Sequence, residues 1–181
     1  YLSTSVIIDK QFTTPIAVNA VDPSRLLIGG SANLYESLNM GDTIIKIATV
    51  GVYNRAIAYG GRRNGVDNPD VLYVSPGRND LYVRTTAGGA VVAKTFPTTA
   101  WYLTDLVINP EDWMNVFIVD TDSVLMTTNG GDTWSDVTGN LLSISSDNIT
   151  TIEFVEAPSP YIVVGTRSGV FASNLGAMGS W

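Results

Sequence analysis

Short apolar runs separated by polar turns occupy most of the chain. The runs are rich in β-branched and aromatic residues and are bounded by Gly, Pro, Asn and Asp, which is typical of β-strands joined by tight turns. No segment combines a helical spacing of apolar residues with capping signals at its ends. The pattern therefore predicts an all-β protein.

Whole groups of strands recur along the chain. Four groups share a proline in a polar turn followed directly by an apolar strand, and these prolines are Pro23, Pro69, Pro110 and Pro158. Their spacing of roughly 40 to 50 residues is the length of one four-stranded blade of a β-propeller. A β-sandwich with regularly spaced turns is the alternative. The recurrence of four-strand units favours a β-propeller of four-stranded antiparallel blades, with about four blades in this chain.

Each group divides into four strands, of which the second follows the proline. We expect the innermost strands at 16–19, 56–59, 105–108 and 151–155. We expect the third strands at 33–37, 81–85, 123–127 and 169–173, and the fourth strands at 43–48, 90–95 and 133–137. The single domain 1–181 then consists of blades at about 11–50, 51–97, 102–140 and 149–181.

The ends of the chain leave the ring open to several interpretations. The last group lacks most of its fourth strand, and an additional strand at 4–9 precedes the first group. That strand could complete the last blade or belong to a missing one. Closed propellers have about 4–8 blades, so a closed ring, an open half-ring, a pair of chains and part of a larger propeller remain possible. The start at Tyr1, without a signal peptide, suggests a processed protein or a fragment.

One turn carries a recognisable motif. Residues 127–134 read Thr-Thr-Asn-Gly-Gly-Asp-Thr-Trp, and residues 37–44 read Ser-Leu-Asn-Met-Gly-Asp-Thr-Ile. The first resembles the Asp-box, or BNR repeat, Ser/Thr-x-Asp/Asn-x-Gly-x-Thr-Trp, and the second is a weaker copy. The corresponding positions of the other two blades, 85–92 and 173–181, match the motif poorly. The residues that carry the resemblance are Thr127, Asn129, Gly131, Thr133 and Trp134, together with Ser37, Asn39, Gly41 and Thr43.

This resemblance is to Asp-box propellers, a group that includes sialidases, xyloglucan hydrolases and the photosystem II assembly factor. It implies that the boxes stabilise turns at the blade periphery, away from any active site. In such a turn glycine supplies a positive φ and the Asn side chain accepts hydrogen bonds from backbone N–H groups. The arginine signature that sialidases carry ahead of the first box is absent, so their catalytic residues are not transferred to this chain.

Composition narrows the chemistry. The chain has no Cys and no His, which excludes disulfides, Cys-based zinc sites and Ser-His-Asp catalysis within these residues. The net charge is −7 and Lys and Arg form no run, which argues against nucleic acid because phosphate binding needs a basic surface. No apolar segment is long enough to span a bilayer.

A pair of carboxylates is the one catalytic hypothesis. Asp105 and Glu153 fall in the expected innermost strands of adjacent blades, and a glycoside hydrolase of the usual kind needs two nearby carboxyl groups. Arg55 could be their ionic partner. Solvated or ion-paired charges lining the channel are the other interpretation.

The turns at one end of the blades are the expected ligand-binding face. Aromatic and polar side chains there would suit a carbohydrate or a peptide. The candidates are Tyr53, Arg55, Arg78, Trp101, Tyr102, Asp120, Asp122 and Arg167. Asp120 and Asp122 could hold Ca²⁺, and no other metal or cofactor is expected. The stretch 60–70 is expected to be a mobile loop.

These observations favour a non-catalytic binding or scaffolding propeller of an exported protein, extracellular or periplasmic, that contacts a carbohydrate or a protein. Two alternatives remain open. The chain could be a fragment of a secreted glycoside hydrolase of the Asp-box type. It could also be a half-propeller that self-assembles, for example as a homodimer.

Overall fold

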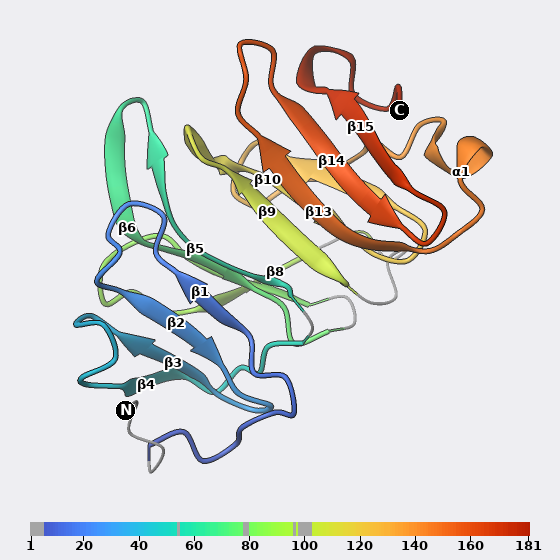
Figure 1. Ribbon diagram of the computed structural model, residues 1–181. Helices are drawn as coiled ribbons and strands as arrows, with labels where there is room; N and C mark the ends of the chain where they lie inside the picture. Colours follow the sequence, from blue (N-terminus) through green and yellow to red (C-terminus); the bar gives the residue numbers. More distant parts are fainter. Residues whose placement is uncertain (1–5, 54, 78–79, 96, 98–102) are drawn as a thin grey trace.

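The computed structural model describes residues 6–53, 55–77, 80–95, 97 and 103–181. It is almost entirely β, with antiparallel sheets throughout (Figure 1). The helical elements in these ranges are one turn of α-helix, α1 (Leu141–Ile144), and one 3-10 turn, η1 (Leu175–Ala177). No helix there is long and apolar enough to cross a membrane. The all-β prediction is confirmed.

The strands follow one another as four blades, each an up-and-down antiparallel sheet. The first blade contains β1 (Ile16–Val18), β2 (Leu26–Gly29), β3 (Leu34–Ser37) and β4 (Ile45–Ala48). The second contains β5 (Ile57–Arg63), β6 (Val66–Val74), β7 (Leu81–Arg84) and β8 (Val92–Lys94). The third contains β9 (Asp105–Asn109), β10 (Asp112–Val119), β11 (Val124–Thr127) and β12 (Ser135–Asp136). The fourth contains β13 (Ile149–Val155), β14 (Tyr161–Thr166) and β15 (Val170–Asn174).

The blades form an arc in chain order (Figure 1). Their first strands contact one another in succession, β1 with β5, β5 with β9 and β9 with β13. Residues 6–9 lie beside the first blade and the C-terminus lies beside the last. The first strands therefore line the concave side of the arc.

Apolar layers between the blades hold the arc together. In β10, Val116 and Ile118 face the second blade, whereas Phe117 and Val119 face the fourth. This alternation follows from the two-residue period of a strand, and it lets one strand contribute to two cores. The second and third blades are consequently covered on both faces by their neighbours.

A buried ion pair joins the first and second blades. Glu36 on β3 accepts hydrogen bonds from the Arg84 guanidinium on β7 and from the Tyr59 hydroxyl on β5, the latter at 2.5 Å. Nearby, Arg25 reaches across the same interface to Asp70 at 2.8 Å. Such pairs need close geometry because burial removes the hydration of both charges.

The prediction of a mobile loop at 60–70 is wrong. The long strands β5 and β6 continue through this stretch and turn at Asn64 and Gly65, which have φ values of 53° and 75°. Two successive positive φ angles define the tight hairpin turn that matches the twist of the flanking strands, and Asn-Gly is its favoured sequence. Next to this turn, Arg63 pairs with Asp112 of β10, so the second and third blades share one sheet.

The expected strand at 4–9 is also not observed where residues are described, since 6–9 lie outside every strand. These residues pack on the outer face of the first blade rather than completing the last. Ile7 is buried there against Ile28, Tyr35 and Ile44.

Asp9 fixes this N-terminal segment through the turn between β2 and β3. Its carboxylate accepts hydrogen bonds from the N–H groups of Ala32 and Asn33, at 2.7 and 2.8 Å, and from the Tyr35 hydroxyl at 2.5 Å. A Cβ on Gly30 would lie 2.5 Å from both carboxylate oxygens. Glycine at position 30 therefore leaves the space that Asp9 occupies.

The turns after β3 and β11 have the same hydrogen bonds. Thr127 Oγ1 accepts from the N–H groups of Asn129 and Gly131, and Asn129 Oδ1 accepts from the N–H of Thr133. The Asn129 amide also donates to Thr133 Oγ1. The first blade repeats every one of these bonds with Ser37, Asn39, Gly41 and Thr43. Trp134 is half-buried against the core between the second and third blades.

The C-terminal stretch 173–181, which corresponds to these turns in the fourth blade, is not followed by a fourth strand. The Trp181 indole N–H donates to the carbonyl of Val137, and its backbone N–H donates to Asn140 Oδ1. The end of the chain thus folds back towards the third blade.

Candidate ligand-binding groove

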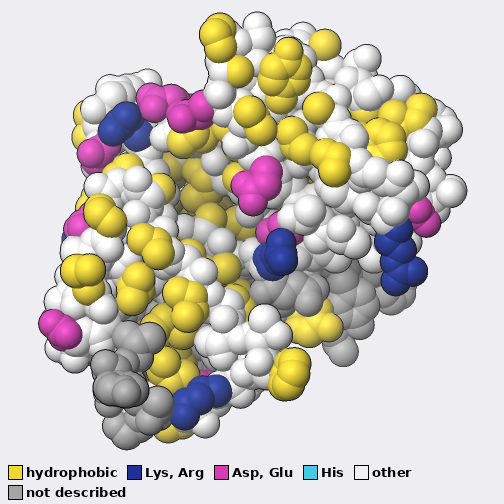
Figure 2. Space-filling model, in the orientation of Figure 1, with side chains coloured by type: hydrophobic (Ala, Val, Ile, Leu, Met, Phe, Trp, Pro, Cys, Tyr) yellow, Lys and Arg dark blue, Asp and Glu magenta, His cyan; other side chains and the backbone are white. Residues whose placement is uncertain are grey.

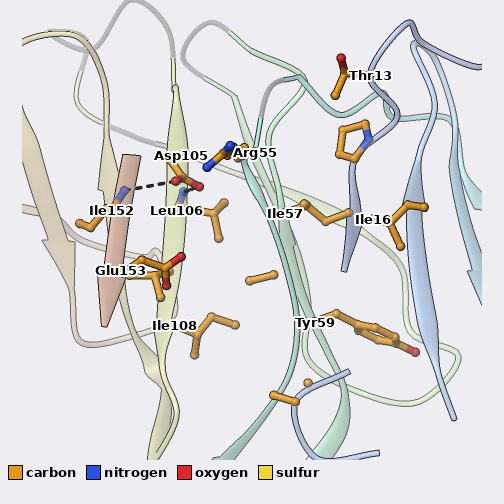
Figure 3. Close-up of a pocket in the computed structure, with 15 residues that line it drawn as sticks. Thr13, Ile16, Arg55, Ile57, Tyr59, Asp105, Leu106, Ile108, Ile152 and Glu153 are labelled. Atoms are coloured by element: carbon orange, nitrogen blue, oxygen red, sulfur yellow. Dashed lines mark hydrogen bonds between the residues drawn. The ribbon is translucent and has the colours of Figure 1, made fainter. Parts of the chain in front are cut away.

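The concave side of the arc contains a groove with a volume of about 500 Å³. Its walls are mainly apolar side chains from the first strand of each blade (Figure 3). Figure 2 shows this groove as a hollow with hydrophobic walls and a few charged side chains near its centre. The wall residues include Ile16, Ile57, Leu106, Ile108 and Ile152.

A second pocket of about 530 Å³, which we call the mouth pocket, lies at one end of the groove. It shares Thr13 and Arg55 with the groove. It is formed by residues just before, or at the start of, the first strand of each blade. The segments that contain these residues bond to the turns that follow the second strands: Tyr53 N–H donates to the Ser75 carbonyl, and Ile149 N–H donates to that of Thr121. The two sets of turns therefore lie at the same end of the molecule.

Arg55 is the cation at the junction of the two pockets. Its backbone forms a parallel bridge with Asp105, which fixes the start of β5 beside β9. The side chain is exposed, and no ion pair involving it is found in the described ranges. The sequence-based expectation of an Arg55 salt bridge to Asp105 or Glu153 is thus not met.

Asp105 is buried and its carboxylate is engaged. Oδ2 accepts hydrogen bonds from Thr151 Oγ1 at 2.6 Å and from Ile152 N–H at 3.2 Å, and Oδ1 accepts from Leu106 N–H at 2.9 Å (Figure 3). Burial raises the pKa of Asp105, while the bonds from Thr151, Ile152 and Leu106 oppose the rise. The side chain joins the first strands of the third and fourth blades.

Glu153 differs from Asp105 because it is exposed in the groove. The two acids do lie on adjacent first strands, as the sequence predicted, and both line the same groove. Of these two acids, only Glu153 has a carboxylate without hydrogen bonds to the described part of the protein. The groove thus offers one free anion, one free cation and apolar walls.

Asp120 stabilises the turn in which it lies. It is 2% exposed, and its Oδ1 accepts hydrogen bonds from the N–H groups of Asp122 and Ser123 at 3.0 and 2.6 Å. Its Oδ2 is buried and has no hydrogen-bond partner in the described ranges. Burial raises the pKa of Asp120, and the neighbouring Asp122 adds to the rise. No cluster of three or more potential metal ligands occurs in the part of the chain that is described.

The other sequence-predicted ligand residues are divided. Tyr53 lines the mouth pocket together with Arg55. Arg167 is exposed but lines neither pocket. Arg78, Trp101 and Tyr102 lie outside the described residues.

Four mouth residues were not anticipated. Gln11, Phe12, Thr104 and Thr150 all line the mouth pocket, and Phe12 is fully exposed there. Gln11, Phe12 and Thr104 belong to segments that lead into a blade, and Thr150 lies near the start of β13. Tyr53 and Arg55, which lead into the second blade, were predicted to bind a ligand. The equivalent positions of the other blades could have been predicted from them.

The fold and the groove together define a propeller-type all-β protein. No family model and no curated protein sequence matches the chain. Among solved structures, a chain in the crystal structure of a nidogen/laminin complex, which has a propeller-type fold, is similar with a TM-score of 0.62 at 13% identity. The match covers 89% of this chain and 59% of that one. Myxococcus xanthus glutaminyl cyclase gives a TM-score of 0.48 at 15% identity, over 89% of this chain and 72% of that one.

Proposed function

We propose that this protein is a non-catalytic binding module whose concave groove receives a segment of a protein partner. The observation that carries the proposal is the combination of apolar walls with an exposed Arg55 at the junction of the two pockets, which forms no ion pair with the described residues. Ligand sites are typically concave and apolar with a few polar groups that fix orientation. Asp105, in contrast, is occupied in joining two blades.

A protein partner is favoured over a carbohydrate by the apolar walls, because sugars present many hydroxyl groups that need polar partners. The solved chain with the similar fold belongs to a complex between nidogen and laminin, which gives a precedent for protein binding by this fold. An extended segment with a hydrophobic residue near Ile57 and Leu106 and an acidic residue near Arg55 would complement the groove.

We further propose that the turns at 37–43 and 127–133 are Asp-boxes and that the protein belongs with the sialidase-like propellers. Support comes from the shared hydrogen-bond pattern of the two turns. An extracellular or periplasmic location and binding without a cofactor are parts of the same proposal.

A displayed library of random peptides tests the groove. Selection on the parent protein should enrich sequences that combine apolar and acidic residues. Titration of an enriched peptide should then show at least a tenfold loss of affinity in Arg55→Ala, because a charge-assisted bond to the ligand is removed. Arg167→Ala is the matched control, since this arginine is also exposed but lines neither pocket. Failure to enrich any sequence, or equal binding to both variants, would overturn the proposal.

A glycoside hydrolase is the second candidate, and the placement of Asp105 and Glu153 on adjacent strands favours it. The test is hydrolysis of a panel of aryl glycosides by the parent protein and by Glu153→Gln. A binding module gives no hydrolysis above buffer. Turnover that disappears in Glu153→Gln would establish the hydrolase instead.

A further inference from the structure

The chain contains two Asn-Gly pairs, Asn64-Gly65 and Asn129-Gly130. In such a pair the backbone nitrogen of the second residue can attack the side-chain amide of the first, and glycine favours the attack because it has no Cβ to hinder the approach. Both pairs lie in turns, and the two glycines have similar positive φ angles, 75° for Gly65 and 70° for Gly130. The surroundings of the two pairs differ.

Hydrogen bonds hold both reacting groups of the Asn129-Gly130 pair. Asn129 Oδ1 accepts from the Thr133 N–H at 2.9 Å, and the Asn129 amide donates to Thr133 Oγ1 at 2.8 Å. The Gly130 N–H, which would be the attacking group, donates to the Met114 carbonyl at 2.9 Å, and Gly130 is buried. These bonds must break before the nitrogen of Gly130 can reach the side-chain carbon of Asn129.

The Asn64-Gly65 pair forms the turn of the long hairpin of β5 and β6 (Figure 1), and both residues are exposed. Neither the Asn64 side chain nor the Gly65 N–H makes a hydrogen bond within the described part of the chain. A Cβ built on Gly65 would meet no atom within 4 Å. The amide and the nitrogen that would attack it are therefore both open to water.

We propose that Asn64 is a site of spontaneous deamidation and that the fold protects Asn129 from the same reaction. The Gly65 nitrogen loses its proton and bonds to Cγ of Asn64, while the bond from Cγ to Nδ2 breaks and Nδ2 leaves as ammonia. Water then opens the resulting five-membered imide at one of its two carbonyl carbons. Opening at the side-chain carbonyl gives aspartate and opening at the main-chain carbonyl gives isoaspartate, so that the net reaction consumes one water and releases one ammonia.

The two products affect the hairpin differently. Asp-Gly, like Asn-Gly, is favoured in this type of turn, so the aspartate product keeps the hairpin. Isoaspartate adds a carbon atom to the main chain, which disturbs a two-residue turn that sets Arg63 opposite Val66. The disturbance lies beside the Arg63–Asp112 pair that connects the second and third blades. Neither residue of the turn lines the groove or the mouth pocket, so this site is independent of the proposed function.

Peptide mapping by mass spectrometry after incubation at mildly alkaline pH measures both sites in one sample. In the folded protein Asn64 should convert at least about tenfold faster than Asn129, because the hydrogen bonds around Asn129 add to its barrier. In concentrated urea the two rates should become similar, since both pairs then lie in an unfolded chain. Equal rates in the folded protein, or no conversion of Asn64 there, would overturn the proposal.

Two variants separate the reaction from its consequence. Asn64→Gln keeps an exposed amide, but its longer side chain would have to close a six-membered ring, so conversion at this position should fall by at least about tenfold. Freshly prepared Asn64→Asp carries the charge of the product without isoaspartate and should unfold thermally as the fresh parent does. The incubated parent, enriched in isoaspartate, should unfold at a lower temperature. Conversion that continues unchanged in Asn64→Gln, or an incubated parent with unchanged unfolding, would contradict the proposal.

Discussion

At the scale of single residues, the carboxylate of Asp9 takes the place of a capping side chain that the turn between β2 and β3 does not have. In the third blade, Asp120 accepts the N–H groups two and three residues later in its own turn. The first blade has Gly30 at that position, and Asp9 from the N-terminal segment accepts the N–H groups of Ala32 and Asn33 instead. The N-terminal segment is thus docked through a bond that the other turns make internally.

This exchange predicts a rescue. Asp9→Ala should lower the free energy of unfolding by about 1–3 kcal/mol, because two turn N–H groups lose their acceptor. Gly30→Asp alone should also destabilise, since its Cβ would meet the Asp9 carboxylate. The double variant should recover most of the loss, because the new carboxylate can cap the turn from within. Urea unfolding of all four proteins measures this, and additive losses would refute the exchange.

The same residue predicts a pH dependence. Burial tends to raise the pKa of Asp9, but hydrogen bonds from Tyr35, Ala32 and Asn33 outweigh it and hold the pKa below the ordinary value of 3.8. Ionised Asp9 therefore contributes stability above pH 3.8, and the contribution is lost as the pH falls through the folded-state pKa. The stability difference between parent and Asp9→Asn should shrink from pH 5 towards pH 2. A constant difference would contradict this assignment.

Met40 occupies a conformation that suits glycine. Its φ is 57°, and the equivalent residue of the similar turn is Gly130 with φ of 70°. The Met40 side chain is 74% exposed, so little packing is lost on its removal. Met40→Gly should raise the free energy of unfolding by about 0.5–1 kcal/mol. Gly130→Ala is the converse control and should lower it, as measured by the same urea unfolding.

At the scale of elements, strand positions were largely predictable and their lengths were not. The apolar runs gave the correct place for β9, β11 and β15 because alternation and bounding turns are local signals. The stretch 60–70 was misjudged because its glycines and charges suggest a loop. Contacts distant in the sequence, such as Arg63 with Asp112 and Trp113, stabilise the long hairpin instead.

The interface between the first two blades depends on a buried ion pair. Arg84→Met should destabilise the protein by about 3–5 kcal/mol, because Glu36 would remain buried without its cation. Adding Glu36→Gln in the same chain should restore part of that loss, since the remaining side chain is neutral and can still bond to Tyr59. Thermal and urea unfolding of the single and double variants measure the coupling. A double variant no more stable than Arg84→Met would contradict this account.

At the scale of the whole molecule, the repeat predicted the blades, and the sequence could not show how the chain ends would pack. The apolar residues at 6–8 are compatible both with a strand and with a segment that covers the first blade. The burial of Ile7 and the hydrogen bonds of Asp9 show which occurs, and both depend on contacts distant in the sequence. The sequence predicted that Asp105 and Glu153 lie on adjacent innermost strands, whereas the engagement of Asp105 depends on Thr151 in another blade.

The arc brings residues from four separate blades to one concave surface, and the proposed function depends on that convergence. Amide chemical-shift changes on adding a peptide enriched from the displayed library test it most directly. We predict that the changes cluster at the start of β5, along β9 and along β13, around Arg55, Leu106 and Glu153. Changes centred on the peripheral turns at Asn39 and Asn129, with none along the first strands, would contradict a binding groove on the concave side.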